Sequence, residues 1–381
     1  MANRPVGKGF HQLQPLLDDH SARHRDDRRG GLSRKADTAD PNPFAERYPA
    51  DRLRHQGRHR DAGRRSGRLS ASSFRQQIGL RMQNSSDQFR IIQISDPHLG
   101  RRRPFFQHNW EVLVELLAAE TYDLVVCTGD MSMEGAQFEA ELAFAARQFK
   151  RIRGPIAFVP GNHDIGNSLP DVRGGETVIT TARREAYLRH FGPDFWTRDI
   201  GSHWRLVGLN SMLPGSGLEG EAQQQVMVEE AAASAAGRRL MVFKHKPLYM
   251  GTPDETVLSQ SALYPEHRNR LRDALSPASD ALVCSGHIHD YKTATWQNLQ
   301  QIWAPSTAFV IDRDGLQYPV HGIRRAGYLV HTLSGDGHVH AFVEPDRFLN
   351  IDVGNWMRAP ESFHARYHTE PLRGLILAGD E

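Results

Sequence analysis

Residues with carboxylate, amide and imidazole side chains recur between positions 96 and 289, each time directly after an apolar run typical of a strand. The five groups are Asp96-Pro-His98, Gly129-Asp130, Gly161-Asn-His-Asp164, His245 and Gly286-His-Ile-His289. Because the ends of neighbouring strands meet at one edge of a sheet, we expect these side chains to converge. Asp, Asn and His supply the oxygen and nitrogen ligands, including a bridging carboxylate, that two adjacent cations need. The pattern therefore predicts a two-metal hydrolase site.

The specificity of this prediction comes from the combination and not from any one group. A lone histidine such as His245 is more often a surface or core residue than a ligand, and isolated Asp-x-His or Gly-Asp sequences occur by chance in many chains. Gly-Asn-His-Asp and Gly-His-x-His are much rarer sequences. Five such groups, each after a strand-like run, favour a metal site over coincidence.

The elements that must position these groups can be traced along the chain. Strands are expected at 89–95, 124–128, 156–159, 204–209, 240–243 and 281–284, and helices at about 109–120, 137–150, 181–190 and 219–236. The mostly apolar strands are typical of a sheet covered on both faces. Strand-like pieces and turns alternate over 291–343, where we expect an antiparallel continuation of a second sheet. The fold class predicted is α/β, a layered sandwich of two mixed sheets with helices outside.

Charge divides the chain into unlike parts. Residues 1–81 contain 18 Lys and Arg against 9 Asp and Glu, whereas residues 82–381 contain 29 against 36. We expect residues 1–85 to be a disordered basic segment, because no helical or strand period there could bury a core. A solvated tail, or a stretch upstream of a true start at Met82, is favoured over a basic arm for nucleic acid or membrane, because aromatic residues spaced for base stacking are absent.

The remaining chain is expected to hold one catalytic domain over residues 86–345 and a C-terminal tail over 346–381. The tail contains Trp356, Phe363 and Tyr367, which leaves open whether it packs over the domain or reaches a second copy in a homodimer. Cys127 and Cys284 are the two cysteines, and both end apolar runs, so reduced buried thiols are expected. No apolar stretch is long enough to cross a bilayer. We therefore expect a cytoplasmic protein with no membrane partner.

The five groups, in this order, resemble the calcineurin-like metallophosphoesterase family, whose pattern is D-x-H, GD, GNH[DE], a lone His and GHxH. The resemblance covers residues 89–343 and implies the family's four-layer α/β/β/α sandwich. Gly-Asn-His-Asp, Gly-His-Ile-His and the Asp-Pro-His-Leu start look closest to the bacterial class III cyclic-nucleotide and glycerophosphodiester phosphodiesterases. The family often has His-His-Pro-Pro where this chain has Lys244-His245-Lys246-Pro247. One imidazole therefore remains as the ligand there, and the two lysines would raise the local positive potential.

The resemblance also implies a role for each residue of the site. Asp96, His98 and His289 would bind one metal ion, Asn162, His245 and His287 would bind the other, and Asp130 would bridge the two. Two divalent or trivalent ions are expected as cofactors, and Mn, Fe and Zn all suit these ligands. The glycines before Asp130, Asn162 and His287 are expected to permit sharp turns. His287 and His289, two positions apart, would point to the same side of an extended segment.

A mechanism follows from this ligand set. A metal-bridging hydroxide would attack phosphorus in line, and no covalent enzyme intermediate is needed. His163 would hydrogen-bond a phosphoryl oxygen or protonate the leaving alkoxide, with Asp164 orienting its other nitrogen. The alternative for Asp164 is a turn-capping acid. In the run 101–103, one arginine is expected either to meet a substrate phosphate or to be exposed without a function.

The expected function is hydrolysis of a small phosphodiester, with a 3′,5′-cyclic nucleotide as first choice. The alternatives are a phosphomonoesterase or a nucleotide-pyrophosphate hydrolase. A nuclease is disfavoured because residues 82–381 are net acidic, and a non-catalytic scaffold would lack ligands that are all present here. Substrate choice is expected to lie in loops near 101–108, 131–137, 165–180 and 250–265.

Overall fold

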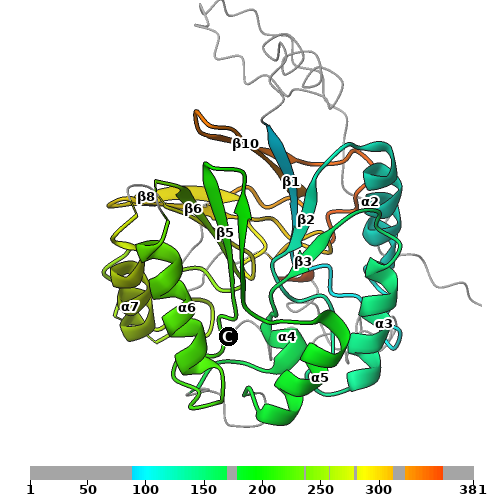
Figure 1. The fold of residues 1–381 in the computed structure, drawn as a ribbon. Helices are drawn as coiled ribbons and strands as arrows, with labels where there is room; N and C mark the ends of the chain where they lie inside the picture. Colours follow the sequence, from blue (N-terminus) through cyan, green and yellow to red (C-terminus); the bar gives the residue numbers. More distant parts are fainter. Residues whose placement is uncertain are drawn as a thin grey trace, which may run out of the picture. The chain divides into compact units, whose positions relative to one another are not determined.

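The structure is a computed structural model, and it describes residues 88–169, 178–235, 237–256, 258–278, 281–311 and 322–354. The expected basic segment 1–85 lies outside these residues, as do 355–381 of the expected tail and 170–177 of the loop after Asp164. Within the described part, two mixed sheets pack face to face, with helices on both outer faces (Figure 1). The α/β sandwich predicted from the sequence is confirmed.

The first sheet has the strand order β11-β10-β1-β2-β3. Its strands are β1 (Phe89–Ile94), β2 (Leu124–Cys127), β3 (Ile156–Phe158), β10 (Tyr328–Leu333) and β11 (His338–Val343). The first three are parallel, and β10 and β11 add antiparallel pairs beside β1. Its helices are α2 (Gln107–Ala119), α3 (Glu139–Phe149), the single-turn α4 (Asn162–Ile165) and α5 (Thr181–Phe191). Side chains of α2, α3 and α5 cover its outer face.

The second sheet has the strand order β4-β5-β6-β7-β9-β8. Its strands are β4 (Trp196–Ile200), β5 (Trp204–Leu209), β6 (Arg239–Lys244), β7 (Ala281–Ser285), β8 (Lys292–Trp296) and β9 (Leu299–Trp303). β5, β6, β7 and β9 are parallel, and an antiparallel strand closes each edge. Helices α6 (Glu221–Ala233) and α7 (Pro265–Leu275) cover the outer face of this sheet.

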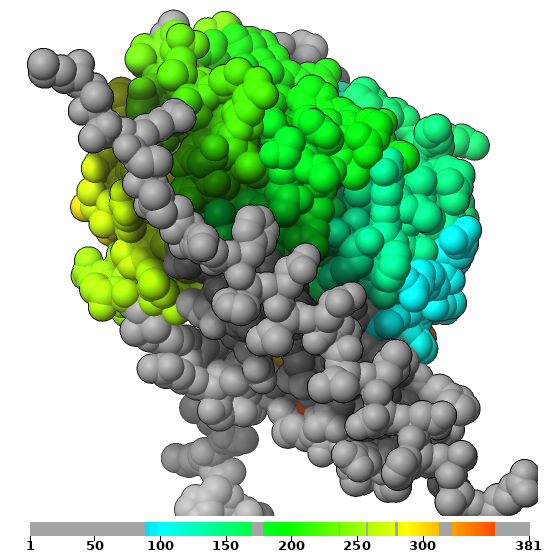
Figure 2. Space-filling view, turned by 90° about the horizontal axis from the view of Figure 1, so that it is seen from below, coloured from blue at the N-terminus to red at the C-terminus, as the bar shows by residue number. Residues whose placement is uncertain are grey.

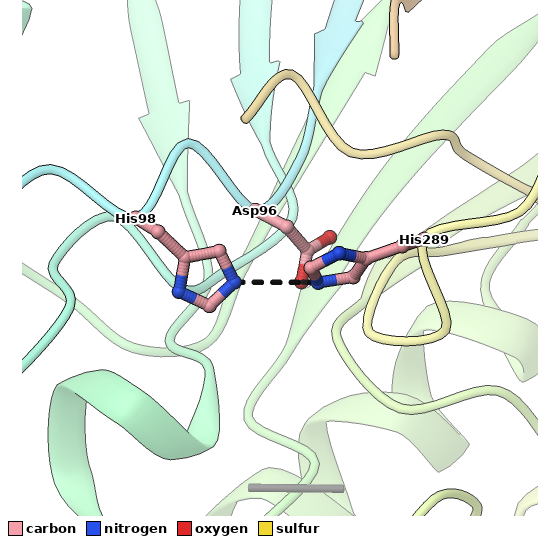
Figure 3. Close-up of side chains that lie close together, drawn as sticks. All are labelled: Asp96, His98 and His289. Atoms are coloured by element: carbon pink, nitrogen blue, oxygen red, sulfur yellow. Dashed lines mark hydrogen bonds and ion pairs between the residues drawn. The ribbon is translucent and has the colours of Figure 1, made fainter. Parts of the chain in front are cut away.

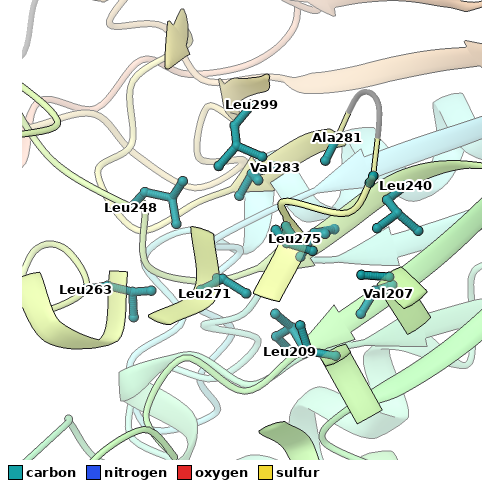
Figure 4. Close-up of a cluster of buried hydrophobic side chains, with 14 of the residues drawn as sticks. Val207, Leu209, Leu240, Leu248, Leu263, Leu271, Leu275, Ala281, Val283 and Leu299 are labelled. Atoms are coloured by element: carbon teal, nitrogen blue, oxygen red, sulfur yellow. The ribbon is translucent and has the colours of Figure 1, made fainter. Parts of the chain in front are cut away.

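Alternation along the strands builds the layers, because successive side chains of a strand point to opposite faces. On β6, Met241 and Phe243 face the first sheet, whereas Leu240 and Val242 face the helices. Figure 4 shows Leu275 of α7 within the cluster of strand side chains on that outer face. Both faces of the central strands are therefore buried away from water, which explains the apolar composition of these strands.

The region expected to extend the second sheet is divided between the two sheets instead. β8 and β9 join the second sheet, but β10 and β11 return to the first sheet beside β1. The expectation was therefore wrong for 328–343, because strand-like periodicity does not specify a partner. It was also wrong about the direction of β9, which pairs with β7 in parallel, whereas β8 is antiparallel as expected. The sequence also left β4 and α7 unassigned: β4 is a polar edge strand, and α7 buries only a narrow side of a highly charged helix. No helix among the described residues has the length and apolar character to span a membrane.

The start of the expected tail, residues 346–354, packs against the first layer of helices. Asn109 of α2 donates to the Leu349 carbonyl at 2.9 Å and accepts from the Leu349 amide at 2.8 Å. Phe348 is buried in the core beneath α2, and Val353 is fully buried against Phe309 and its neighbours. This segment therefore belongs to the packed layers as far as it is described.

A polar network lies within the first sheet, on the face that packs against the second sheet. Gln93 Oε1 lies 2.9 Å from His331 Nε2, and His331 Nδ1 lies 3.0 Å from His338 Nε2. An amide oxygen can only accept, so His331 donates from Nε2 and accepts at Nδ1, which requires His338 Nε2 to donate. Burial lowers the pKa of His331 well below its ordinary value and that of His338 to about 4, and it also lowers the pKa of His340, whose ring stacks on that of His338. The network therefore favours neutral imidazoles.

This network predicts a loss of stability in acid. Below about pH 6.5 these histidines take up protons in the unfolded chain but stay neutral in the folded one. The part of the unfolding free energy that is present above that pH is therefore lost as the pH falls from about 6.5 to about 4. His338→Gln keeps a donor but removes the titration, and it should make the unfolding free energy of chelator-treated protein less pH-dependent by about 1 kcal/mol per pH unit. Urea unfolding between pH 7 and 5 measures this, with exposed His203→Gln as the control. An unchanged pH slope in His338→Gln would contradict it.

Candidate metal centre

Seven of the predicted residues lie just beyond the ends of five strands. Asp96 and His98 follow β1, Asp130 follows β2, Asn162 opens α4 after β3, His245 follows β6, and His287 and His289 follow β7. All seven are buried, with exposed fractions of 7% or less. Because the strands within each sheet are parallel here, their carboxyl ends deliver the side chains to the same edge. The structure therefore brings together every residue predicted as a metal ligand.

One group of donors consists of Asp96, His98 and His289, whose candidate ligand atoms lie within 4.8 Å of one another (Figure 3). His289 Nε2 is 3.4 Å from Asp96 Oδ1, and His98 Nε2 is 3.3 Å from His289 Nε2. The sequence predicted these three as the ligands of one ion. They come from both sheets, since β1 carries two of them and β7 the third.

A second group consists of Asp130, His245 and His287, again within 4.8 Å. His245 Nε2 lies 3.3 Å from Asp130 Oδ2 and 3.0 Å from the Asn162 side-chain oxygen. Asp130 is also 3.8 Å from His98 Nε2 of the first group. This carboxylate therefore lies between the two groups, the position expected of a bridging ligand.

Backbone carbonyls orient three of the imidazoles. His245 Nδ1 donates to the Thr128 carbonyl at 2.8 Å, His289 Nδ1 to the Phe309 carbonyl at 3.1 Å, and His287 Nε2 to the Gln260 carbonyl at 3.1 Å. A carbonyl oxygen can only accept, so in the neutral form of each ring the other nitrogen carries the lone pair that a cation would bind. Such contacts are how proteins fix the rings of metal-binding histidines.

These residues fit a pair of cations. Lone pairs of oriented imidazoles and the oxygens of two buried carboxylates and one amide converge in a site that is shielded from water. Nδ1 of buried His98 has no hydrogen-bond partner, and its Nε2 faces another imidazole nitrogen. Bound cations would give these atoms the interactions that the surrounding side chains do not supply.

Electrostatics favour anionic carboxylates at this site. Burial raises the pKa of Asp130, but the charges of His245 and His163 outweigh it and hold that pKa well below its usual range. The pKa of Asp96 is lowered in the same way, by His289 above all, against the same cost of burial. Burial lowers the pKa of His245 as well, yet Asp130 and Asp96 together raise it to about 9. Burial depresses the pKa of His98.

The backbone at this site is unusual. Asp96, His98, Asp130, His287 and His289 all have positive φ, between 43° and 72°. Only one other non-glycine residue of the described part, Gln297, shares this property. Left-handed backbone costs such residues of order 1–3 kcal/mol each and persists where the surroundings enforce it. Contrary to the expectation from their spacing, His287 and His289 therefore do not lie in an extended segment. Each has its own left-handed backbone turn, and the two side chains join different donor groups.

The glycines before the ligands have two different roles. Gly129 has φ +103°, so a sharp turn does require glycine there, as expected. At Gly161 and Gly286 space is the reason: a Cβ at Gly161 would overlap the Asp130 carboxylate, and one at Gly286 would overlap Ser95 Oγ. The motifs thus depend on glycine because ligands from neighbouring strands pack directly against the backbone.

His163 and Asp164 lie at the site in different capacities. His163 Nδ1 donates to the Met133 carbonyl at 2.9 Å, its backbone amide donates to Asp130 Oδ1 at 2.9 Å, and its ring meets that of His98 edge-on at 4.8 Å. Asp164 instead accepts from Gly161 N and from Ser132 N and Oγ, at 2.8–2.9 Å. Asp164 therefore caps the turns and does not orient His163, so that prediction was wrong and its turn-capping alternative holds. Burial and the charge of Asp130 raise the pKa of Asp164 to about 6.

The three arginines after β1 all contact other side chains. Arg101 is 3.9 Å from Glu141, Arg103 is 3.3 Å from Glu134, and Arg102 packs over the Phe138 ring at 3.9 Å.

Lys244 and Lys246, on either side of His245, are almost completely buried. The carbonyl partners of the imidazoles could not be found from the sequence, because a backbone oxygen leaves no residue signature. Buried Lys246 had one signal: it replaces a residue of the family pattern.

The position of Asp130 predicts how metal content responds to mutation. Asp130→Ala should lose both ions, because one carboxylate faces both groups, whereas Asp96→Asn should retain the second ion. Metal analysis of Mn-reconstituted protein measures the two stoichiometries, and Asp273→Asn on the exposed surface of α7 is the control. Two ions retained by Asp130→Ala would contradict the arrangement.

Comparison with known proteins agrees with this geometry. The family model of the calcineurin-like phosphoesterases matches residues 89–291. The human serine/threonine-protein phosphatase CPPED1 is 30% identical over 198 residues, which are 50% of this chain and 56% of that protein. The 3′,5′-cyclic adenosine monophosphate phosphodiesterase CpdA of Escherichia coli is 26% identical over 230 residues, 57% of this chain and 76% of that protein. The chain thus spans little more than half the length of its human relative.

The family model covers more than half of the chain, and its matched segment contains all five groups of site residues. This chain belongs to the calcineurin-like phosphoesterase family.

Proposed function

We propose that this protein is a metal-dependent phosphodiesterase that hydrolyses a small phosphodiester, with a 3′,5′-cyclic nucleotide as the best candidate. The observation that carries the proposal is the pair of donor groups that meet at Asp130, which belongs to the second group and lies 3.8 Å from His98 of the first. Two cations held there would polarise phosphoryl oxygens and make water a nucleophile near neutral pH. Relatives named as cyclic adenosine monophosphate phosphodiesterases, from Escherichia coli and Pseudomonas aeruginosa, support the choice of substrate.

His163 is the chain's own group for proton transfer. Its Nδ1 is committed to the Met133 carbonyl, so Nε2 is the atom that can face a substrate. When the ring is protonated, Nε2–H can hydrogen-bond a phosphoryl oxygen or pass its proton to the departing alkoxide. The amide contact with Asp130 ties the position of this ring to the carboxylate between the two donor groups.

Charge pairing of the arginines after β1 favours a diester over a monoester. A monoester is a dianion at neutral pH, and its extra charge calls for cationic side chains that are not already neutralised. Two of the three, Arg101 and Arg103, each lie beside a carboxylate, whereas Arg102 packs over the Phe138 ring and keeps its charge. A diester, with its single negative charge, depends less on such cations.

A phosphomonoesterase is the second candidate, because the human relative is named as a serine/threonine-protein phosphatase. Both activities could use the same donor groups and the same proton donor. They differ in the leaving group and in the charge of the substrate, which the loops around the site must accommodate.

We further propose the cytoplasm as the compartment and a small phosphoester as the main partner. Cys127 and Cys284 are both free and buried, which agrees with a reducing environment. The acidic balance of residues 82–381 disfavours a nucleic-acid partner.

A substrate panel tests the proposed function. With Mn²⁺ added, bis-p-nitrophenyl phosphate and cyclic AMP should be hydrolysed at higher kcat/KM than p-nitrophenyl phosphate or nucleoside diphosphates, because the site favours monoanionic diesters; glycerophosphodiesters in the same panel compare cyclic AMP with another diester. Product release is followed by absorbance and chromatography, with Asp130→Ala as the control for contaminating activity. A preference for the monoester would instead establish the second candidate.

Replacing His163 tests its role as a proton donor. His163→Ala should retain both ions but lower kcat for cyclic AMP about a hundredfold or more, because an alkoxide leaves poorly without a proton. The loss should be much smaller for bis-p-nitrophenyl phosphate, whose p-nitrophenolate leaves without help. Equal losses for both substrates would argue against proton donation, and a loss of metal would make His163 a ligand.

A further inference from the structure

Lys246 is a fully buried lysine that directly follows the ligand His245. Burial of a lysine is costly unless hydrogen bonds satisfy its ammonium group, so the contacts of this side chain indicate what holds it there. The ligand set and the proton donor identified above leave Lys246 without a role.

The Lys246 ammonium contacts oxygens from two other segments of the chain. Its Nζ lies 2.5 Å from Asn167 Oδ1, 3.1 Å from Ser168 Oγ and 3.1 Å from Gln260 Oε1. Asn167 and Ser168 come directly after α4, which carries Asn162 and His163, and Gln260 precedes α7. The three donors of one ammonium group therefore connect the end of β6 to the segments after α4 and before α7.

The contact with Gln260 leads to the second donor group, and the backbone of Lys246 adds a second link to it. The backbone carbonyl of Gln260 accepts the hydrogen bond from His287 Nε2 at 3.1 Å. Ser211 Oγ accepts from the backbone amides of both His245 and Lys246 at 3.1 Å. Lys246 thus holds Gln260, Gln260 orients His287, and the backbone of Lys246 shares an anchor with His245.

The first donor group is supported differently. His289 is oriented by the Phe309 carbonyl, and the Phe309 ring packs against the rings of His98 and His289 at 4.8 and 4.4 Å. Among the described residues, no hydrogen bond joins Asp96, His98 or His289 to Lys246 or to the three side chains that its ammonium group contacts. A change at Lys246 should therefore affect the two groups unequally.

We propose that Lys246 is a positioning residue for the second metal ion: it holds the side chain of Gln260, and thereby the backbone carbonyl of Gln260 that orients His287. In this way it sets the affinity of the group formed by Asp130, His245 and His287. The inference rests on the proposed two-ion centre. It concerns the binding of one ion rather than the reaction itself, so it can be tested without measuring turnover.

The chain offers a matched control in Lys244. This lysine is as deeply buried as Lys246 and flanks His245 on the other side. Its ammonium donates to the backbone carbonyl of Lys246 and to none of the side chains that support His287. Lys244→Met and Lys246→Met therefore remove the same group from neighbouring buried positions, and only the second change breaks the contact with Gln260.

The test is a titration of the chelator-stripped full chain with Mn²⁺, followed by calorimetry. Wild-type protein and Lys244→Met should bind two ions with the same pair of affinities. Lys246→Met should keep one of them and bind the other about 10- to 100-fold more weakly, the range typical when a residue that supports a metal ligand is removed. His287→Ala identifies the affected ion, because removing this imidazole should weaken the same binding event that Lys246→Met weakens.

Gln260→Leu gives a second test that leaves the lysine in place, and it decides the question if Lys246→Met does not fold. It should weaken the same ion. Wild-type affinities for both ions in Lys246→Met, equal weakening of both ions, or equal effects of Lys246→Met and Lys244→Met would each overturn the proposal. A wild-type chain that binds two ions but hydrolyses no phosphoester would overturn the proposed function alone.

Discussion

The burial of seven polar side chains, the candidate metal ligands, at one edge of two sheets is the constraint on which the rest of the structure depends. Carboxylates and imidazoles removed from water are costly unless charge and hydrogen bonds compensate them. Here they compensate one another in part, as the lowered pKa of Asp130 and the raised pKa of His245 indicate. Left-handed backbone at five of the ligands adds a further cost. Bound cations would offset both, so this edge of the fold fits a metal centre better than a simple polar core.

Each donor group crosses the boundary between the sheets. The first sheet supplies Asp96 and His98 to one group and the second sheet supplies His289; in the other group Asp130 meets His245 and His287. Neither sheet alone contains a complete set of ligands. The apolar core between the sheets therefore also sets the geometry of the site. Gly129 and Gly286 give room for residues of the opposite sheet, His245 and Asp96, to approach closely.

The surface around this edge is built by segments far apart in sequence. Seen from the end where the strands stop, residues of about 100–200 form one side of the face and residues of the second sheet's helices lie toward the other (Figure 2). Different residues orient the imidazoles of the two donor groups: the Phe309 carbonyl orients His289 in the first, and the Gln260 carbonyl orients His287 in the second. Val353, near the end of the described part, packs in the same cluster as Phe309.

The sequence by itself determined the layered α/β class, the strands that end at the motifs, and the residue types that converge there, because periodicity and motif order are local properties. It did not determine that β10 and β11 join the first sheet, because an alternating strand carries no record of its partner. It also misjudged Asp164 and the turn through His287 and His289. Their roles depend on which backbone atoms lie nearby, such as the Met133 carbonyl that orients His163 in place of Asp164. The contacts of Lys246 with Asn167, Ser168 and Gln260 likewise exist only after distant segments have packed, so the tertiary structure alone decided them.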